Sequence, residues 1–299
     1  MRKIKRKTTK KTESSPQRPD LAVTVQLTQS DTNSEMMEKI EEALKSFDTP
    51  NVQYAYSTHI GTRDSQQDYV DAGTGENGII YGIVCDGMGG LEGGEVASRK
   101  AGQALTAVML KMDPKCNIPA FLTDMVHYIN KFVCELPFKS NDGNGAGTTL
   151  VATVIIGKCL YWISIGDSRI YIIRNNEIEA VTRDHSYSMQ LNEQVLAGTK
   201  TPDEAASDPM RDALISFLGI DKLKIIDSNK NPFLLEPGDI ILICSDGLYR
   251  SLNEHEIMSV IKRHSDNIEE CARVLPLYAY DKSPGGQDNT SVVLIKSLR

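Results

Sequence analysis

The sequence lacks any apolar run near the length of about 18 residues that is needed to cross a lipid bilayer. Its basic N-terminus is not followed by the apolar segment of a secretory signal peptide. The six cysteines are scattered and include no Cys-x-x-Cys pair, so neither a zinc site nor a disulfide framework is indicated. These absences predict a soluble, cytoplasmic protein that does not insert into a membrane.

Positive charge is also scarce outside the first 20 residues. Residues 1–20 carry eight Lys and Arg against two Asp and Glu, whereas the net charge of the 299-residue chain is −7. The acidic remainder argues against nucleic acid as the main partner. An acidic surface suits basic peptides, but solubility is the simpler explanation of the charge.

The chain divides into three parts by composition. Residues 1–34 are rich in Lys, Arg, Thr and Ser and hold few large apolar groups, which predicts a mobile basic tail. Residues 35–50 place apolar side chains at helical spacing, which predicts an amphipathic helix that packs on the main domain or binds a partner. Residues 51–299 are expected to form a single domain.

This domain mixes strand-like runs with pairs of helical patterns. Asn175-Asn176 between two runs predicts a tight hairpin turn. Strands in hairpin succession favour antiparallel sheets covered by helices, and thus an α+β fold. The predicted strands are 52–60, 79–85, 149–156, 160–165, 169–174, 178–182, 223–227, 240–244 and 290–296. The predicted helices are 93–112, 117–136, 253–263 and 267–280.

Residues 186–218 carry no strand signal. Thr201-Pro202-Asp203-Glu204 within them is typical of a helix start, with Pro at the first helical position and acids in the first turn. An insertion of this length in a compact domain predicts a lid or recognition flap.

Four Asp residues stand next to apolar runs of strand length. An apolar strand fixes its ends, so a carboxylate at the tip is held in place. Four such carboxylates suggest a cluster at one edge of the sheets, and hard oxygen ligands of this kind suit Mg²⁺ or Mn²⁺. These residues are Asp86, Asp167, Asp246 and Asp288.

Glycine is concentrated after the first of these acids, with five Gly in the eight residues that follow Asp86. The stretch lacks the Gly-Lys-Ser/Thr of a nucleotide-binding P-loop and breaks the Gly-x-Gly-x-x-Gly register at Glu92. It also lacks Asp-x-Asp, so an aspartyl-phosphate mechanism has no acid pair. Upstream, Arg63 precedes Asp68 by five residues, and Arg is the side chain suited to gripping phosphate with two parallel hydrogen bonds.

Over about residues 53–297, seven motifs in order resemble the metal-dependent protein phosphatase family, the type 2C serine/threonine phosphatases. Residues 196–219 look like the flap of its bacterial branch. The motifs are Gly61–Asp68, Asp86–Gly94, Gly147–Leu150, Gly166–Arg169, Thr182–Ser186, Ser245–Leu248 and Asp288–Ser291.

The resemblance implies an α-β-β-α sandwich of two antiparallel sheets flanked by helices, with a flap subdomain at about 186–218. It also implies hydrolysis of phosphoserine and phosphothreonine in proteins by attack of a metal-bridging water, without a phosphoenzyme. Such an enzyme reverses a serine/threonine protein kinase in signalling, and we expect a monomer. Two alternatives stay open, a small-molecule phosphomonoesterase and a catalytically silent regulatory module of the same fold.

The resemblance further implies the role of each site residue. Asp86 would bridge two Mn²⁺ or Mg²⁺ ions, with the Gly87 carbonyl on the first. Asp246 and Asp288 would complete the second, and Asp167 with Asp246 would form a weaker third site. Asp68 would lie behind these ligands, and Arg63 would hold the substrate phosphate.

Elementary electrostatics explains why such a cluster needs cations. Two carboxylates 4 Å apart repel by about 4 kcal/mol at an effective dielectric constant of 20. Two divalent cations would neutralise four Asp side chains and lower the pKa of a bridging water toward neutrality. One departure concerns Met88, which stands where many eukaryotic members have a His thought to protonate the leaving group, so the general acid is unassigned. A second is Gln67, where the family often has an acid.

Overall fold

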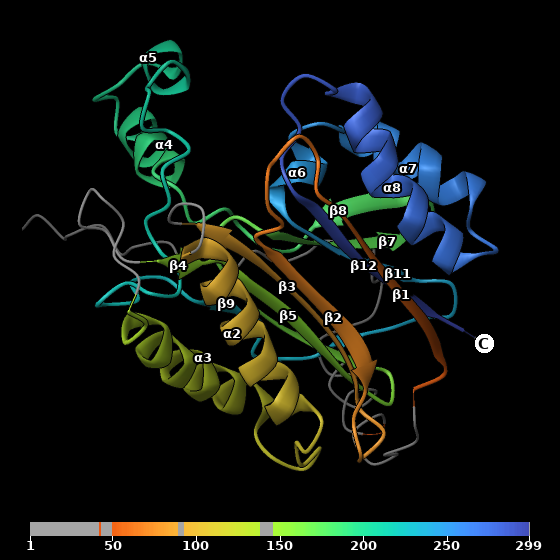
Figure 1. The fold of residues 1–299 in the computed structure, drawn as a ribbon. Helices are drawn as coiled ribbons and strands as arrows, with labels where there is room; N and C mark the ends of the chain where they lie inside the picture. The colour runs from red at the N-terminus through yellow and green to blue at the C-terminus, as the bar shows by residue number, and fades with distance from the viewer. Residues whose placement is uncertain (1–41, 43–49, 89–92, 138–145, 299) are drawn as a thin grey trace, which may run out of the picture.

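The computed structural model describes residues 42, 50–88, 93–137 and 146–298. They form two β-sheets packed face to face, with helices on both outer faces (Figure 1). Every strand pair in the described residues is antiparallel. The predicted α+β fold with its α-β-β-α layers is therefore confirmed. The predicted tail, and the predicted helix at 35–50 apart from residues 42 and 50, lie outside the described residues.

The first sheet joins strands from both ends of the described chain. In sheet order it consists of β1 (Val52–His59), β12 (Thr290–Ser297), β11 (Ile240–Cys244), β7 (Arg169–Arg174) and β8 (Glu177–Ala180). Asn175 and Asn176 join β7 to β8 with φ angles of 52° and 67°, the left-handed pair that a two-residue hairpin turn requires. The predicted tight turn is confirmed.

The second sheet is built mainly from the first half of the domain. In sheet order it consists of β10 (Phe233–Leu234), β6 (Cys159–Ile165), β5 (Leu150–Ile156), β3 (Ile80–Met88) and β2 (Asp68–Thr74). The short β4 (Gly147–Thr148) pairs with β3, and β9 (Asp227–Ser228) pairs with β6. Strands β3, β5 and β6 are buried on both faces, which is why they read as continuous apolar runs.

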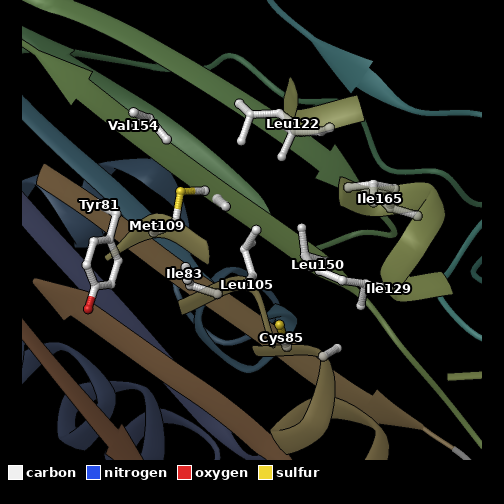
Figure 2. Close-up of a cluster of buried hydrophobic side chains, with 14 of the residues drawn as sticks. Tyr81, Ile83, Cys85, Leu105, Met109, Leu122, Ile129, Leu150, Val154 and Ile165 are labelled. Carbon is white, nitrogen blue, oxygen red and sulfur yellow. The ribbon is translucent and has the colours of Figure 1, made fainter. Parts of the chain in front are cut away.

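Two helix pairs cover the outer faces of the sheets. Helices α2 (Gly93–Met109) and α3 (Ile118–Cys134) cover the second sheet, and α7 (Glu254–Arg263) and α8 (Ile268–Lys282) cover the first. Figure 2 shows the layer under α2 and α3, where Ile83 and Cys85 of β3 meet Leu105 and Met109. A separate apolar layer lies between the two sheets.

The local sequence explains where the helices start. The side chain of Asn253 accepts a hydrogen bond from the backbone N–H of Glu256, and the Glu256 carboxylate accepts one from the backbone N–H of Asn253, which forms a capping box. Thr201 and Glu204 do the same at α5 (Pro202–Ala206), where the predicted helix start is confirmed.

Residues 186–218, which we call the flap segment, contain α5 and a second helix, α4 (Ser188–Leu196), that the sequence did not indicate. In Figure 1 these helices stand apart from the two sheets. The base of the segment is closed by hydrogen bonds from Tyr187 N–H to the Ala213 carbonyl and from Ser188 N–H to the Arg211 carbonyl.

One strand prediction is largely wrong, and strands β2, β4 and β10 were not predicted. Residues 223–226 form no strand, and only Asp227 and Ser228 pair with β6. The Ser216 hydroxyl donates to the Ile225 carbonyl and accepts from the Ile225 N–H. These backbone groups therefore hydrogen-bond to a side chain and not to a neighbouring strand. Strand β2 was missed because two Asp and a Gly among its seven residues weaken its β propensity.

No helix in the described part of the chain is both long and apolar enough to span a bilayer.

Candidate active site

The four strand-end aspartates come from both sheets. Asp86 lies within β3, and Asp167 follows β6 of the same sheet. Asp246 begins the short helix α6 (Asp246–Tyr249) after β11, and Asp288 precedes β12, so these two extend from the other sheet. The candidate site therefore lies where the ends of the two sheets meet.

Asp68 joins this group from β2. It stands opposite Asp86 in the register of β2 and β3. Its carboxylate accepts a 2.7 Å hydrogen bond from the Ser245 hydroxyl, which lies at the end of β11 in the other sheet. Ser245 in turn accepts from the Ser291 N–H at 2.9 Å. A chain of hydrogen bonds thus connects the two sheets directly under the carboxylates.

Burial and mutual repulsion raise the pKa values of these acids. Burial, reinforced by the charges of Asp246 and Asp288, raises the pKa of Asp68 to about 7. Burial also raises the pKa of Asp86 well above its ordinary value, and all four other acids of the group add to that shift. The pKa of Asp167 is raised to about 6, again chiefly by burial and next by Asp246. The group therefore carries more negative charge than its surroundings stabilise.

Two arginines offset part of this charge. Arg63 Nη2 lies 2.5 Å from Asp288 Oδ2. Arg250 reaches two acids, with Nε 2.9 Å from Asp246 Oδ2 and Nη2 3.3 Å from Asp167 Oδ2. Arg63 was predicted, whereas Arg250 was missed. Its spacing of four residues from Asp246 is the helical spacing of an ion pair, but the four-residue helix that creates the contact was not predicted.

The loop that carries Arg63 is held by Asn289, another residue that the sequence did not single out. The Asn289 amide donates to the Ile60 and Ser65 carbonyls at 2.8 and 3.1 Å and accepts from the Gln67 N–H at 2.7 Å. Gly61 has φ +68°, and a Cβ there would lie 2.4 Å from the Asp288 carbonyl oxygen. The loop therefore lies too close to the start of β12 for any side chain at residue 61.

Asp86 and Gly87 are fixed by close backbone contacts. The Asp86 carbonyl accepts from the Thr149 N–H at 2.8 Å and from the Thr148 hydroxyl at 2.9 Å. A Cβ on Gly87 would lie 2.2 Å from the carbonyl oxygen of Gly94, in the first turn of α2. Glycine is needed here because the strand and the helix touch through their backbones.

The donor set fits hard divalent cations. Its side chains supply only carboxylate oxygens, the ligand type that Mg²⁺ and Mn²⁺ prefer. The Oδ1 atoms of Asp68 and Asp246 are buried, and neither has a hydrogen-bond partner in the described structure. Across residues 50–88, 93–137 and 146–298, no three His, Cys, Asp or Glu side chains already stand in ligating geometry. Carboxylates of like charge repel until a cation draws them together.

Comparison with known proteins agrees with this fold. The model of the family described as protein phosphatase 2C matches residues 57–277. The serine/threonine phosphatase stp of Listeria welshimeri is 32% identical over 220 residues, which cover 72% of this chain and 83% of the relative. The solved serine/threonine phosphatase of S. agalactiae has a TM-score of 0.72 and 30% identity, covering 83% of this chain and all of that one.

A further solved structure is the catalytic domain of the phosphatase PstP in complex with two manganese ions. It has a TM-score of 0.65 and 29% identity, and the match covers 83% of this chain and 99% of that one.

The sandwich of two antiparallel sheets flanked by helices is the architecture of the matching serine/threonine phosphatase structures. This chain belongs to the protein phosphatase 2C family and is a protein serine/threonine phosphatase. The resemblance stated from the motifs is thereby confirmed.

Proposed function

We propose that this phosphatase hydrolyses phosphoserine and phosphothreonine in proteins with two divalent cations, Mn²⁺ or Mg²⁺, and so reverses a serine/threonine protein kinase. The observation that supports this best is the meeting of five buried or half-buried carboxylates at the ends of two sheets, beside an exposed arginine. We further propose that the protein acts as a cytoplasmic monomer.

In this proposal Asp86, the Gly87 carbonyl, Asp246 and Asp288 hold the two ions, and Asp167 with Asp246 holds a weaker third. Bound cations would neutralise the carboxylates, polarise the phosphate and lower the pKa of a coordinated water. Asp68 lies behind Asp86 and adds negative charge that strengthens cation binding.

Arg63 is the residue proposed to bind the substrate phosphate. Its side chain is 58% exposed, so an incoming phosphate can reach it, and its present partner is the carboxylate of Asp288. A guanidinium can offer two parallel N–H groups to a phosphate. Met88 has no dissociable proton, so the proton for the leaving alkoxide comes from water rather than from that side chain.

The proposal is tested by hydrolysis of an aryl phosphate and of a phosphothreonine peptide. We expect turnover of both with Mn²⁺, none after chelation, and a loss of at least about a thousandfold in Asp246→Ala. Activity that survives both chelator and substitution would disprove the metal mechanism. Turnover of the aryl phosphate alone would favour a small-molecule phosphomonoesterase, and an inactive wild-type protein with Mn²⁺ would favour a silent regulatory module.

A further inference from the structure

Arg250 contacts two of the carboxylates that are proposed to hold cations. Its guanidinium contacts Asp246 through Nε at 2.9 Å and Asp167 through Nη2 at 3.3 Å. The two carboxylates are mostly buried, with 13% and 9% of their side chains exposed, whereas Arg250 is 48% exposed. The positive group thus closes the outer side of an acid pair whose members lie on different sheets.

The position of Arg250 is fixed by the backbone and by the preceding residue. Its N–H donates to the Asp246 carbonyl, which closes the turn of α6. The Tyr249 hydroxyl donates to the Asp167 carbonyl at 2.9 Å. The Tyr249 ring lies under the guanidinium carbon of Arg169 at 3.6 Å, and Arg169 is held by two hydrogen bonds to Asp184.

A guanidinium and a divalent cation cannot both use the same carboxylate oxygens. Arg keeps its proton at all physiological pH values, so it leaves these oxygens only by moving. Because Arg250 is half-exposed and its side chain is flexible, it can swing toward solvent at moderate cost. Each cation that binds there must therefore displace it.

We propose that Arg250 is a tethered counter-ion that competes with a divalent cation for the Asp167–Asp246 pair. It weakens most the site that depends on Asp167 and Asp246, and weakens less the inner sites, where Asp246 acts together with further acids. The inference rests on the proposed function, since it presumes that the inner acids bind cations. It concerns affinity and the order in which ions bind, not the chemical step.

The competing explanation is that Arg250 forms an ordinary stabilising ion pair. The chain offers a matched control in Arg273, which makes two hydrogen bonds to Glu270 on the exposed face of α8. Arg273→Gln removes a comparable ion pair that lies on a different helix. Arg250→Gln removes the charge but keeps a polar side chain, and Arg250→Lys keeps the charge but loses the fork that spans both acids.

The experiment is a Mn²⁺ binding isotherm on the full chain, by calorimetry and by electron paramagnetic resonance of free Mn²⁺. In Arg250→Gln we expect the weakest Mn²⁺ site to tighten about tenfold, and the tighter sites to change by no more than about twofold. A third bound ion that is detected only in this variant would support the same conclusion, because the site would have become tight enough to detect. Arg250→Lys should shift the weakest site less, and Arg273→Gln should match the wild type. Adding Asp167→Asn to Arg250→Gln should abolish the gain.

Three results would overturn the inference: an unchanged weakest site, a weaker one, or equal tightening of all sites. If Arg250→Gln does not fold, the lysine variant decides the question, because a loosened or unchanged weakest site there contradicts competition. A wild-type protein that binds no Mn²⁺ would instead contradict the proposed function, so the two failures are distinguishable.

Discussion

Strand β7 carries an arginine at each end, and the surroundings of the two arginines differ in how charge is balanced. Arg174 is 7% exposed and binds Asp239, which is 2% exposed, through hydrogen bonds of 2.9 and 2.6 Å. It also binds Glu236 and the Leu234 carbonyl. We call these residues the Arg174 cluster. Its buried charges all have partners.

Arg169, at the other end of β7, lies beside the group of five aspartates, which we call the acid cluster. Arg169 itself is paired with Asp184. The ion-pair partners of the acid cluster within the described residues are the half-exposed Arg63 and Arg250, and the buried Oδ1 atoms of Asp68 and Asp246 accept no hydrogen bond there. Breaking a balanced buried network is costly because it leaves a charge unpaired, whereas an unbalanced cluster already costs stability that a bound cation offsets.

The largest expected difference between the clusters concerns activity. Asp86→Asn removes the acid proposed to bridge both ions, so kcat/KM with Mn²⁺ should fall by a factor on the order of 10³ or more. Asp239→Asn in the Arg174 cluster should leave kcat per folded molecule within about twofold. Equal losses in the two variants would remove the functional distinction between the clusters.

Stability should respond in the opposite sense. Arg174→Ala leaves Asp239 buried without its partner, which should cost about 3–5 kcal/mol of unfolding free energy and lower Tm by about 10 °C. In chelator, Asp86→Asn should raise Tm, because it relieves repulsion within the acid cluster. Thermal unfolding of both variants in chelator measures this contrast, and a lower Tm in Asp86→Asn would contradict it.

The pH dependence of stability should also separate the clusters. The folded-state pKa values of Asp68 and Asp167, about 7 and about 6, lie above the ordinary 3.8. The folded state therefore binds more protons than the unfolded state between about pH 4 and pH 7, so in chelator stability is lost as pH rises through this window. In wild-type protein, Tm should fall as pH rises from about 4 to about 7. The fall should be smaller in Asp68→Asn than in the control variant Asp239→Asn. A Tm that rises in wild-type protein would contradict the sign.

A smaller loss of stability is expected from breaking the hydrogen bonds that join Asp68 in the second sheet to the first sheet. Ser245→Ala removes the hydroxyl that donates to Asp68 and accepts from Ser291, at a cost of about 1–3 kcal/mol by denaturant unfolding. Ser251→Ala serves as the control, because the Ser251 hydroxyl donates to the side chain of Gln287 and not to an acid of the cluster. Equal losses of unfolding free energy in the two variants would mean that the hydrogen bonds between the sheets contribute no more than an ordinary serine hydroxyl.

The smallest effect should come from residues 1–48. We propose that the catalytic domain is 51–299 with its flap at about 186–218, and that residues 1–34 and 35–50 lie outside it. Deletion of residues 1–48 should leave aryl phosphate turnover within about twofold. A collapse of turnover would show that they belong to the domain.

The sequence predicted the acid cluster because four of its members adjoin apolar runs that fold as buried strands, as Asp86 and Asp246 illustrate. It did not reveal Arg250 or Asn289, since their roles depend on which segments meet in space. The sequence also predicted a strand over 223–227 that is mostly absent, because the backbone of Ile225 hydrogen-bonds to the Ser216 hydroxyl and not to another strand. Local patterns identify strands, but the order β1-β12-β11 joins distant segments that no local pattern relates.

That order has a consequence for how the protein is made. Strand β12 comes later in the chain than every other described strand, yet it lies between β1 and β11, and Asp288 lies two residues before its start. On the ribosome, β1 must wait for β12 before it gains its neighbour in the first sheet, since synthesis proceeds from the N-terminus. A nascent chain that ends before Asp288 lacks both this neighbour and that carboxylate. Under the proposed mechanism, the cation site is therefore complete only after the end of the chain has been synthesised.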